Sequence, residues 1–280
     1  MASRLDSICQ VLEYIEAHLR AQITVADMAN HCGYSFFHFI RLFNQFASQT
    51  PYDYLIRRRL SEARKDLYVT DHSITTLAYD YCFETPESFS RAFRRVFGLL
   101  PSVFRTGQPL SACLPIPPKI RIDLEFIQQG GYVPPQIVSI EEIQITSVPV
   151  SIGNQEQFDL DMQIDSLKKF LPPRRLNNND RYFSVISFNE DPFSPLYHFF
   201  GVALESLNFP PPVSVQHIPS GSYVRFSYHQ SNRQSALRYI FYTWLPQARL
   251  SLSDRFLVEE YPINQCQNSH SSIFIPVKSN

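Results

Sequence analysis

Residues 85–98 read TPESFSRAFRRVFG, and this stretch decides the fold of the first third of the chain. Its four large apolar residues recur at i, i+4, i+7 and i+8, which is one face of a helix. They are Phe89, Phe93, Val96 and Phe97. Thr85 is a typical N-cap residue, Pro86 suits the first helical position, and Gly98 suits the position just past the end. The stretch predicts a capped amphipathic helix with a basic side, which by itself is most often a solvated surface.

The same pattern occurs earlier in the chain. TVADMANHCGY (24–34) aligns with SITTLAYDYCF (73–83), and at an offset of 50 the following helix repeats, so that Arg41 is equivalent to Arg91. Each copy predicts a short helix, a tight turn and a second helix. A duplicated helical hairpin without a role in DNA binding is the alternative, and the matching caps and arginines make it the weaker one.

The two turns differ at one position. Gly33 can take a positive φ in the first turn without strain, whereas Cys82 stands at the equivalent place in the second. The second turn is therefore either strained at Cys82 or reshaped.

Residues 5–107 resemble the double helix-turn-helix domain of AraC-type bacterial transcription regulators. FSRAFRRVFGLLPSVFR (89–105) and ANHCGYSFFHFIRLFNQF (29–46) carry the resemblance. It implies that helices 35–47 and 85–97 each enter a major groove and that residues 52–68 form the helix connecting them. It also implies duplex DNA and RNA polymerase as partners.

The resemblance assigns DNA contacts to both reading helices. Arginine suits guanine and phosphates, glutamate can accept from cytosine, and apolar side chains can touch thymine methyl groups. The groove-facing positions are Phe37, Ile40 and Arg41 in the first helix and Pro86, Glu87 and Arg91 in the second. The expected phosphate contacts are Arg58, Arg94 and Arg95.

Composition limits the classes of protein to which the chain can belong. The 280 residues carry 25 basic and 26 acidic side chains, so any basic footprint is a local patch. The five cysteines show no metal-binding spacing, and no apolar run reaches the ~18 residues of a membrane span. We expect a cytoplasmic protein with no metal, no cofactor and no membrane partner.

Residues 108–135 have proline and glycine spacings that argue against a helix or a central strand, so most of this segment is predicted to be a linker. It would join a DNA-binding domain at 1–107 to a second domain at 136–280. Within the second domain LKKFLPPRRL (167–176) aligns with IFYTWLPQARL (240–250). Two βαββ units are therefore predicted, forming a curved sheet with a groove between the halves. The fold class is multidomain, an all-α domain followed by an α+β domain.

The last part of the chain resembles the gyrase-inhibitor-like (GyrI-like) effector-binding domain. The segments concerned are PSGSYVRFSYH (219–229), YTWLPQ (242–247) and FLVEEYP (256–262). The resemblance implies an open pocket for small amphipathic molecules, with Glu259 as its acidic residue. The aromatic residues expected beside it are Tyr223, Trp244 and Tyr261. A carboxylate between aromatic faces favours a flat cationic effector.

The leading interpretation is a ligand-responsive regulator that binds specific DNA sequences and is not an enzyme. The sequence contains no Ser/His/Asp constellation, no carboxylate pair of clear role and no metal-binding spacing, so no catalytic residue is assigned. Two alternatives stay open: a hydrolase-like GyrI domain, and a small-molecule-binding protein whose DNA-binding half is weakened.

Overall fold

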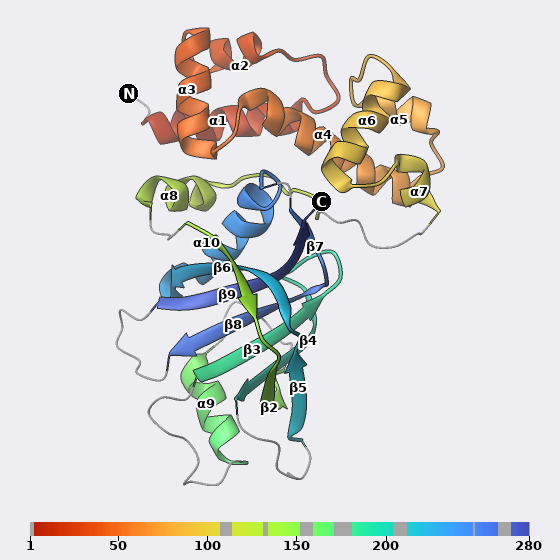
Figure 1. Cartoon of the computed structure of the whole chain (residues 1–280). Helices are drawn as coiled ribbons and strands as arrows, with labels where there is room; N and C mark the ends of the chain where they lie inside the picture. Colours follow the sequence, from red (N-terminus) through yellow and green to blue (C-terminus); the bar gives the residue numbers. More distant parts are fainter. Residues whose placement is uncertain are drawn as a thin grey trace. The chain divides into compact units, whose positions relative to one another are not determined.

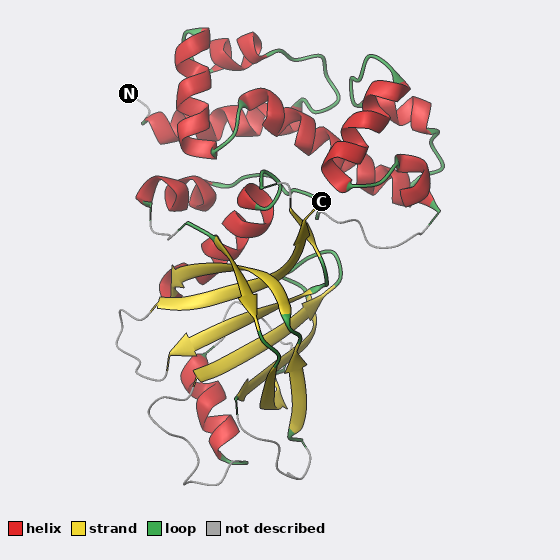
Figure 2. Cartoon of the chain, viewed as in Figure 1, coloured by secondary structure: helices red, strands yellow, loops and turns green. Residues whose placement is uncertain are grey.

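The computed structural model describes residues 3–106, 114–130, 134–151, 159–170, 181–203, 212–248, 250–262 and 270–279. Its elements fall into two compact units (Figures 1 and 2). The helical unit comprises Met1–Gly131 and Gln234–Arg249, and the sheet unit comprises Tyr132–Arg233 and Leu250–Asn280. The predicted multidomain fold is confirmed, while the boundaries at 107 and 136 stay a prediction.

The first helix-turn-helix consists of α2 (Val25–His31) and α3 (Phe36–Ala47), which pack against α1 (Arg4–Ala17). Gly33 takes a φ of 70° in the turn. The turn is closed by hydrogen bonds from Gly33 N–H to the carbonyl of Asn30 (3.1 Å) and from Tyr34 N–H to that of Ala29 (3.0 Å).

The second copy consists of α5 (Ile74–Asp80) and α6 (Pro86–Phe97), followed by α7 (Pro101–Arg105). Its turn repeats the two hydrogen bonds of the first, because Cys82 N–H donates to Tyr79 and Phe83 N–H donates to Ala78, each at 2.9 Å. Cys82 has a φ of 60°, so the turn keeps its shape with a non-glycine residue in the left-handed region. Of the two alternatives for this turn, the strained one is confirmed.

The predicted start and end of α6 are confirmed as well. Thr85 caps the helix by accepting a hydrogen bond from Ser88 N–H, and Gly98 ends it with a φ of 79°. The predicted connecting helix is α4 (Pro51–Val69). It gives Tyr54 and Leu55 to the core of the first copy and, from Ile56 onward, its apolar side chains to the core of the second.

A helix, α8 (Arg121–Gln129), occupies part of the segment expected to be a linker. The prediction that 108–135 contains no helix is wrong, because its prolines all lie outside 121–129 and Gly130 takes a φ of 59° just after the helix. Asp123 stabilises the first turn by accepting from Ile120 N–H at 2.9 Å. Leu124 is completely buried in the core of the first copy, so α8 is part of the helical unit.

The helical unit also contains residues from late in the chain, in α10 (Arg233–Tyr239) and the π-helical stretch η3 (Ile240–Trp244). Arg238 holds Asp123 of α8 with two bonds of 2.6 and 2.8 Å. Lys119 Nζ donates to Thr243 Oγ1 at 2.6 Å, and burial lowers the pKa of this lysine to about 8. These contacts join segments more than a hundred residues apart in the sequence.

The sheet unit is antiparallel, and its described strands run in the order β1-β6-β9-β8-β3-β4-β2-β5, with β7 beside β9. The strands are β1 (Gln136–Ile140), β2 (Ile143–Pro149), β3 (Arg181–Phe188), β4 (Pro195–Val202), β5 (Ser214–Ile218), β6 (Gly221–His229), β7 (Leu250–Leu252), β8 (Phe256–Pro262) and β9 (His270–Ser279). The helix α9 (Leu160–Lys168) follows β2. The predicted βαββ repeats are β2-α9-β3-β4 and β6-α10-β8-β9, although 171–176 of the aligned segments lie outside the described residues.

The sheet is curled. β1 pairs with β6 at one end of the strand order, and β2 pairs with β4 and β5 at the other. Only Glu141 and Glu142 connect β1 to β2, so the end of β1 and the start of β2 are three Cα–Cα steps apart, at most ~11 Å. The two ends of the sheet are therefore drawn together. One apolar cluster, which includes Phe183 and Val258, faces one side of the sheet, and another packs with α9 on the opposite side.

Candidate nucleic-acid interface and ligand pocket

α6 presents a charged face opposite its buried phenylalanines. Four exposed side chains recur at i, i+4, i+7 and i+8, the spacing of one helical face: Glu87, Arg91, Arg94 and Arg95. Among the described residues no ion pair engages the three arginines. They are therefore available to an external anion.

α3 presents the equivalent face with different chemistry. Its exposed positions at the same spacing are Phe37, Arg41, Asn44 and Gln45. Phe37 is 83% exposed, which is unusual for a phenylalanine, and Arg41 is the single cation of the face. Asn44 and Gln45 were not predicted as site residues, although the offset of 50 aligns them with Arg94 and Arg95. The predicted positions Ile40 and Pro86 are only half-buried.

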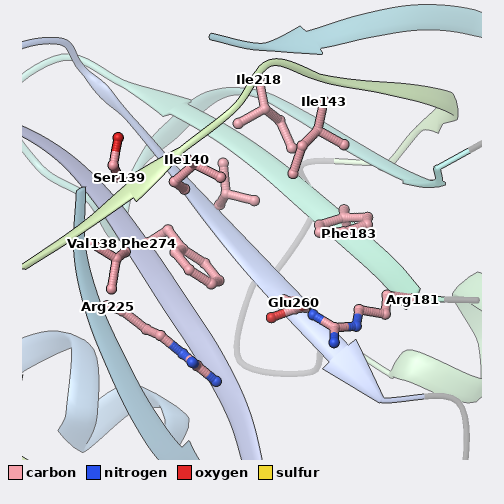
Figure 3. A pocket seen from close by; sticks show the side chains of 11 residues that line it. Val138, Ser139, Ile140, Ile143, Arg181, Phe183, Ile218, Arg225, Glu260 and Phe274 are labelled. Carbon is pink, nitrogen blue, oxygen red and sulfur yellow. Dashed lines mark hydrogen bonds and ion pairs between the residues drawn. The ribbon is translucent and has the colours of Figure 1, made fainter. Parts of the chain in front are cut away.

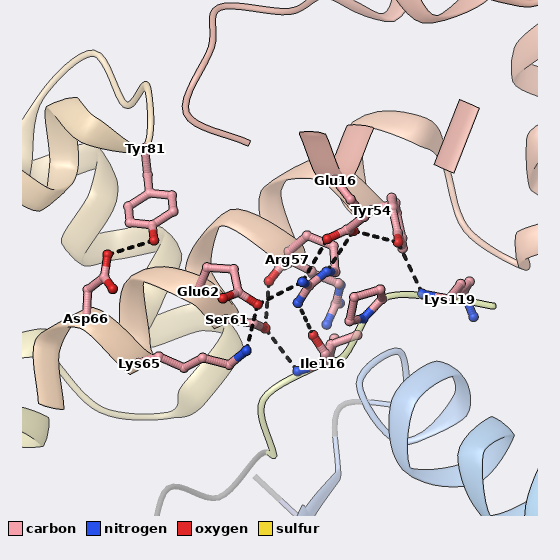
Figure 4. A network of polar contacts seen from close by, with 12 residues as sticks. Glu16, Tyr54, Arg57, Ser61, Glu62, Lys65, Asp66, Tyr81, Ile116 and Lys119 are labelled. Atoms are coloured by element: carbon pink, nitrogen blue, oxygen red, sulfur yellow. Dashed lines mark hydrogen bonds and ion pairs between the residues drawn. The ribbon is translucent and has the colours of Figure 1, made fainter. Parts of the chain in front are cut away.

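Arg58 is not on this surface, and its predicted phosphate contact has to be corrected. Its side chain is 2% exposed. Its partners come from α1, α4 and the segment before α8, and Figure 4 labels three of them, Glu16, Glu62 and Ile116. The guanidinium bonds both carboxylate oxygens of Glu16 and one of Glu62 at 2.8 Å, and donates to the carbonyl of Ile116. Tyr54 completes the network by donating to Glu16 at 2.8 Å. Buried cations of this kind hold helices together and cannot reach DNA.

Two further basic residues of α4, Arg59 and Arg64, are also buried. Arg59 donates to the carbonyls of Leu19 and Ala21 at 2.9 and 2.6 Å. The buried Arg64 guanidinium lies 4.7 Å from the ring centre of Phe104. In the helical unit, Arg94 and Arg95 are neighbouring basic residues that are both exposed.

In the sheet unit the predicted acidic residue, Glu259, is fully buried and already paired. Arg233 Nε lies 2.9 Å from one carboxylate oxygen and bonds the other at 3.0 Å, and Tyr261 donates a short hydrogen bond. Burial raises the pKa of the Tyr261 hydroxyl well above its usual range, so it stays a donor. Any effector that binds at Glu259 has to compete with Arg233 for its charge.

A buried histidine lies on the same side of the sheet as Glu259. Ser184 is the strand partner of Glu259, and its hydroxyl lies 3.0 Å from Nε2 of His198. Burial, and secondly the charge of Arg233, lower the pKa of His198 to about 4. The imidazole is therefore neutral at physiological pH.

On the other side of the sheet a pocket of about 240 Å³ is open to a ligand (Figure 3). Val258 and Glu260 line it, and since side chains alternate along a strand, Glu259 and Tyr261 point away from it. The full lining is Val138, Ser139, Ile140, Ile143, Arg181, Phe183, Ile218, Arg225, Val258, Glu260 and Phe274.

The other two predicted effector contacts also lie outside this lining. Tyr223 is 2% exposed, and its hydroxyl donates to the carbonyl of Pro219 at 2.7 Å. Trp244 belongs to the helical unit. Effector contacts at Glu259, Tyr223, Trp244 and Tyr261 therefore stay a prediction.

The described residues contain no group of histidine, cysteine and carboxylate side chains placed to hold a metal ion. Their helices include none long and apolar enough to cross a bilayer.

Comparison with known families gives two matches that together span most of the chain. A family described as a helix-turn-helix domain matches residues 14–107. A family described as an integron-associated effector binding protein matches residues 136–277. The two matches follow one another along the chain without overlap.

Individual relatives match shorter parts of the chain. The HTH-type transcriptional activator AarP of Providencia stuartii is 33% identical over 98 residues, which cover 35% of this chain and 73% of AarP. The Tn10 TetD protein of Escherichia coli is 36% identical over 101 residues, covering 36% of this chain and 73% of TetD. The HTH-type transcriptional regulator YbfP of Bacillus subtilis (strain 168) is 31% identical over 149 residues, which are 45% of this chain. The chain spans half the length of YbfP.

Proposed function

Since the chain belongs to the AraC-type helix-turn-helix regulators and joins that domain to an integron-associated effector-binding domain, we propose that it is a transcription regulator whose DNA binding responds to a small molecule. Duplex DNA and a small amphipathic effector are the proposed partners, and RNA polymerase is a third. The proposed location is the cytoplasm.

The equivalent exposed faces of α3 and α6 carry this proposal. Packing within a helical bundle does not require three exposed arginines without ion pairs. Phosphates and the edges of guanine bases bind arginine side chains strongly. The duplication places one such face on each side of α4, whose 19 residues span about 28 Å. Successive major grooves lie ~34 Å apart, so modest bending of DNA or tilting of the helices lets both enter.

The two helices have different proposed roles. α6 carries three of the four arginines and supplies most of the electrostatic attraction, with Arg94 and Arg95 on phosphates. We assign Arg91 and Arg41 to base edges, most simply those of guanine. In α3 the exposed ring of Phe37 contacts thymine methyl groups, so this helix contributes sequence preference with little dependence on salt.

Selection of bound duplexes from a random pool with the full chain tests the proposal. We expect a preferred site with two contact patches about one helical turn apart. Arg41→Ala and Arg91→Ala should each weaken binding to the selected site by ~1–3 kcal/mol and relax the base preference at one position of the site. Lys168→Ala removes an exposed cation from α9 of the sheet unit and should leave affinity unchanged.

Equal affinity of the Arg91→Ala variant for the selected site would contradict the base-reading role. Recovery of no preferred sequence would favour the alternative in which the chain is a small-molecule-binding protein with a weakened DNA-binding half. A response to the effector is tested separately, by measuring affinity for the selected site with and without ligand.

A further inference from the structure

Arg225 gives the pocket of the sheet unit a positive charge that no carboxylate in the described part of the chain balances. Its Nε donates to Ser272 Oγ at 3.3 Å, and its guanidinium carbon lies 5.9 Å from the centre of the Phe274 ring. Its two terminal nitrogens have no hydrogen-bond partner among the residues that the structure describes. The other two charged groups of the lining, Arg181 and Glu260, neutralise each other in an ion pair.

The lining is divided into a polar end and an apolar end. Figure 3 shows Arg225, Arg181 and Glu260 at one end of the pocket and Ile143 and Ile218 at the other. At the apolar end Ile143 faces Ile218 between β2 and β5. At the polar end Arg181 and Glu260 form an ion pair.

We infer that this pocket binds a small amphipathic anion, with its acidic group on Arg225 and its apolar body among the isoleucines, valines and phenylalanines. The inference rests on the proposed ligand response and names the class of ligand. It differs from the cationic effector expected from Glu259, because that carboxylate lies on the opposite side of the sheet and is paired with Arg233.

The charge of the site favours an anion over a cation. Two arginines and one glutamate line the pocket, so an entering carboxylate finds a free guanidinium, and guanidinium–carboxylate pairs are strong and directional. For an ammonium group the only carboxylate of the lining is Glu260, which is already paired with Arg181. The ammonium group would have to displace Arg181 from Glu260 and lose its own hydration, which costs free energy.

The size and walls of the pocket favour a compact aromatic body. Its volume of about 240 Å³ lies below the ~300–1,000 Å³ usual for drug-sized ligands. Phe183 and Phe274 contribute rings to the lining, and aromatic rings prefer offset or edge-to-face contacts with other rings. Two fused rings with one carboxylate, as in naphthoate, match both constraints.

Calorimetric titration of the full chain, without DNA, tests the inference with three probes of similar shape. These are the naphthoate anion, the isosteric neutral naphthamide and the naphthylmethylammonium cation. We expect naphthoate to bind with one-to-one stoichiometry at least tenfold more tightly than naphthamide, since charged hydrogen bonds are the stronger kind, and the cation to bind most weakly.

Substitutions of the charged lining residues Arg225, Arg181 and Glu260 distinguish an effect on the charge of the pocket from an effect on folding. Arg225→Gln should lower naphthoate affinity about tenfold or more and leave naphthamide unchanged. Glu260→Gln frees Arg181 and should raise naphthoate affinity. The double variant Arg181→Gln/Glu260→Gln keeps the net charge and should bind naphthoate like the parent. Thermal unfolding of each variant verifies that the fold is retained.

Equal affinity for naphthoate and naphthamide, or tightest binding of the cation, would overturn the inference. So would an Arg225→Gln variant that is folded and binds naphthoate like the parent. If naphthoate binds as expected but leaves affinity for the selected DNA unchanged, the pocket assignment stands and the proposed ligand response fails.

Discussion

Cys82 carries the backbone strain of the second helix-turn-helix. Its φ of 60° costs an L-residue with a side chain roughly 1–2 kcal/mol, a cost that the glycine in the first turn does not have. The hydrogen bonds of the two turns are equivalent. The rest of the helical unit therefore holds this turn in a shape that its sequence does not prefer.

Cys82→Gly should raise the free energy of unfolding by up to about 1 kcal/mol. Glycine removes the strain, and the greater freedom of the unfolded chain offsets part of the gain. Denaturant titration of the full chain measures the effect. The matched control is Gly33→Ala, which should destabilise by about 1–2 kcal/mol through its φ of 70° alone, because a methyl group there meets no atom within 4 Å. A Cys82→Gly variant less stable than the parent would remove the strain argument.

His198 makes stability depend on pH. Its pKa is about 4 in the folded protein and near 6.5 otherwise, so between these values the unfolded chain binds more protons than the folded chain. Stability should therefore fall as pH is lowered through this range, by about 2 kcal/mol from about pH 7 to about pH 5. His198→Gln should remove this part of the slope in denaturant titrations at several pH values. An unchanged slope would show that His198 is accessible to protons in the folded state.

Substitutions of Arg58 and Arg94 compare a buried structural arginine with an exposed arginine that is proposed to contact DNA. Arg58→Met removes the guanidinium bonds to Glu16, Glu62 and the carbonyl of Ile116, and should destabilise the protein by about 3 kcal/mol. Arg94→Ala should change stability by no more than about 0.5 kcal/mol and lower the slope of log affinity against log salt by roughly one. Unfolding and salt-dependent DNA binding of both variants are the two measurements. A lowered salt slope in folded Arg58→Met would contradict the structural role.

The helix α8 completes the core of the first helix-turn-helix. Leu124 is buried beside α1 and α3, and the segment before the helix supplies the carbonyl of Ile116 to Arg58. Gln128 adds a hydrogen bond to the carbonyl of Gln45, the last residue of the exposed face of α3. A helix-turn-helix domain that ends at residue 107 lacks these contacts.

A fragment of residues 1–131 should therefore be more stable than one of residues 1–107, by at least about 2 kcal/mol, which is the usual cost of losing one buried leucine. Leu124→Ala in the longer fragment should remove most of that difference. Circular dichroism during denaturation measures all three. Equal stability of the two fragments would show that α8 adds nothing to the first core.

The two units share one helix. α10 begins at Arg233, which pairs with Glu259 of β8, and continues into residues that pack with α8, where Arg238 holds Asp123. The chain thus crosses from the sheet unit to the helical unit and back within one βαββ repeat. We propose that a shift of β8 on ligand binding reaches α8 through α10 and its two ion pairs, Arg233–Glu259 and Arg238–Asp123.

Arg238→Gln should weaken this coupling. It leaves the pocket lining intact, so ligand affinity should equal that of the parent, whereas the change in DNA affinity caused by ligand should become at least severalfold smaller. Titration of ligand, and of the selected DNA with and without ligand, measures both. Lys168→Ala serves as the control, since α9 lies outside this route. A full response in Arg238→Gln would show that the signal does not pass through α10.

The sequence by itself determined the double helix-turn-helix, its caps, its connecting helix and the two βαββ repeats. These follow from periodicity, capping residues and internal duplication, all of which are local in the chain. It also placed Arg91 and Arg41, since a residue four or eight positions from another on a helix shares its face.

Only the tertiary structure decided which arginines are exposed and which charged side chains form ion pairs. Arg58 and Arg94 look alike in the sequence, and one is buried because carboxylates and carbonyls from α1 and the segment before α8 surround it. Arg225 and Glu260 line one pocket for two reasons. Strand alternation puts their side chains on the same side of the sheet, and the short link between β1 and β2 curls the sheet so that β1, β2, β6 and β8 all contribute to the pocket. Burial and ion pairing arise between segments distant in the chain, which no local pattern records.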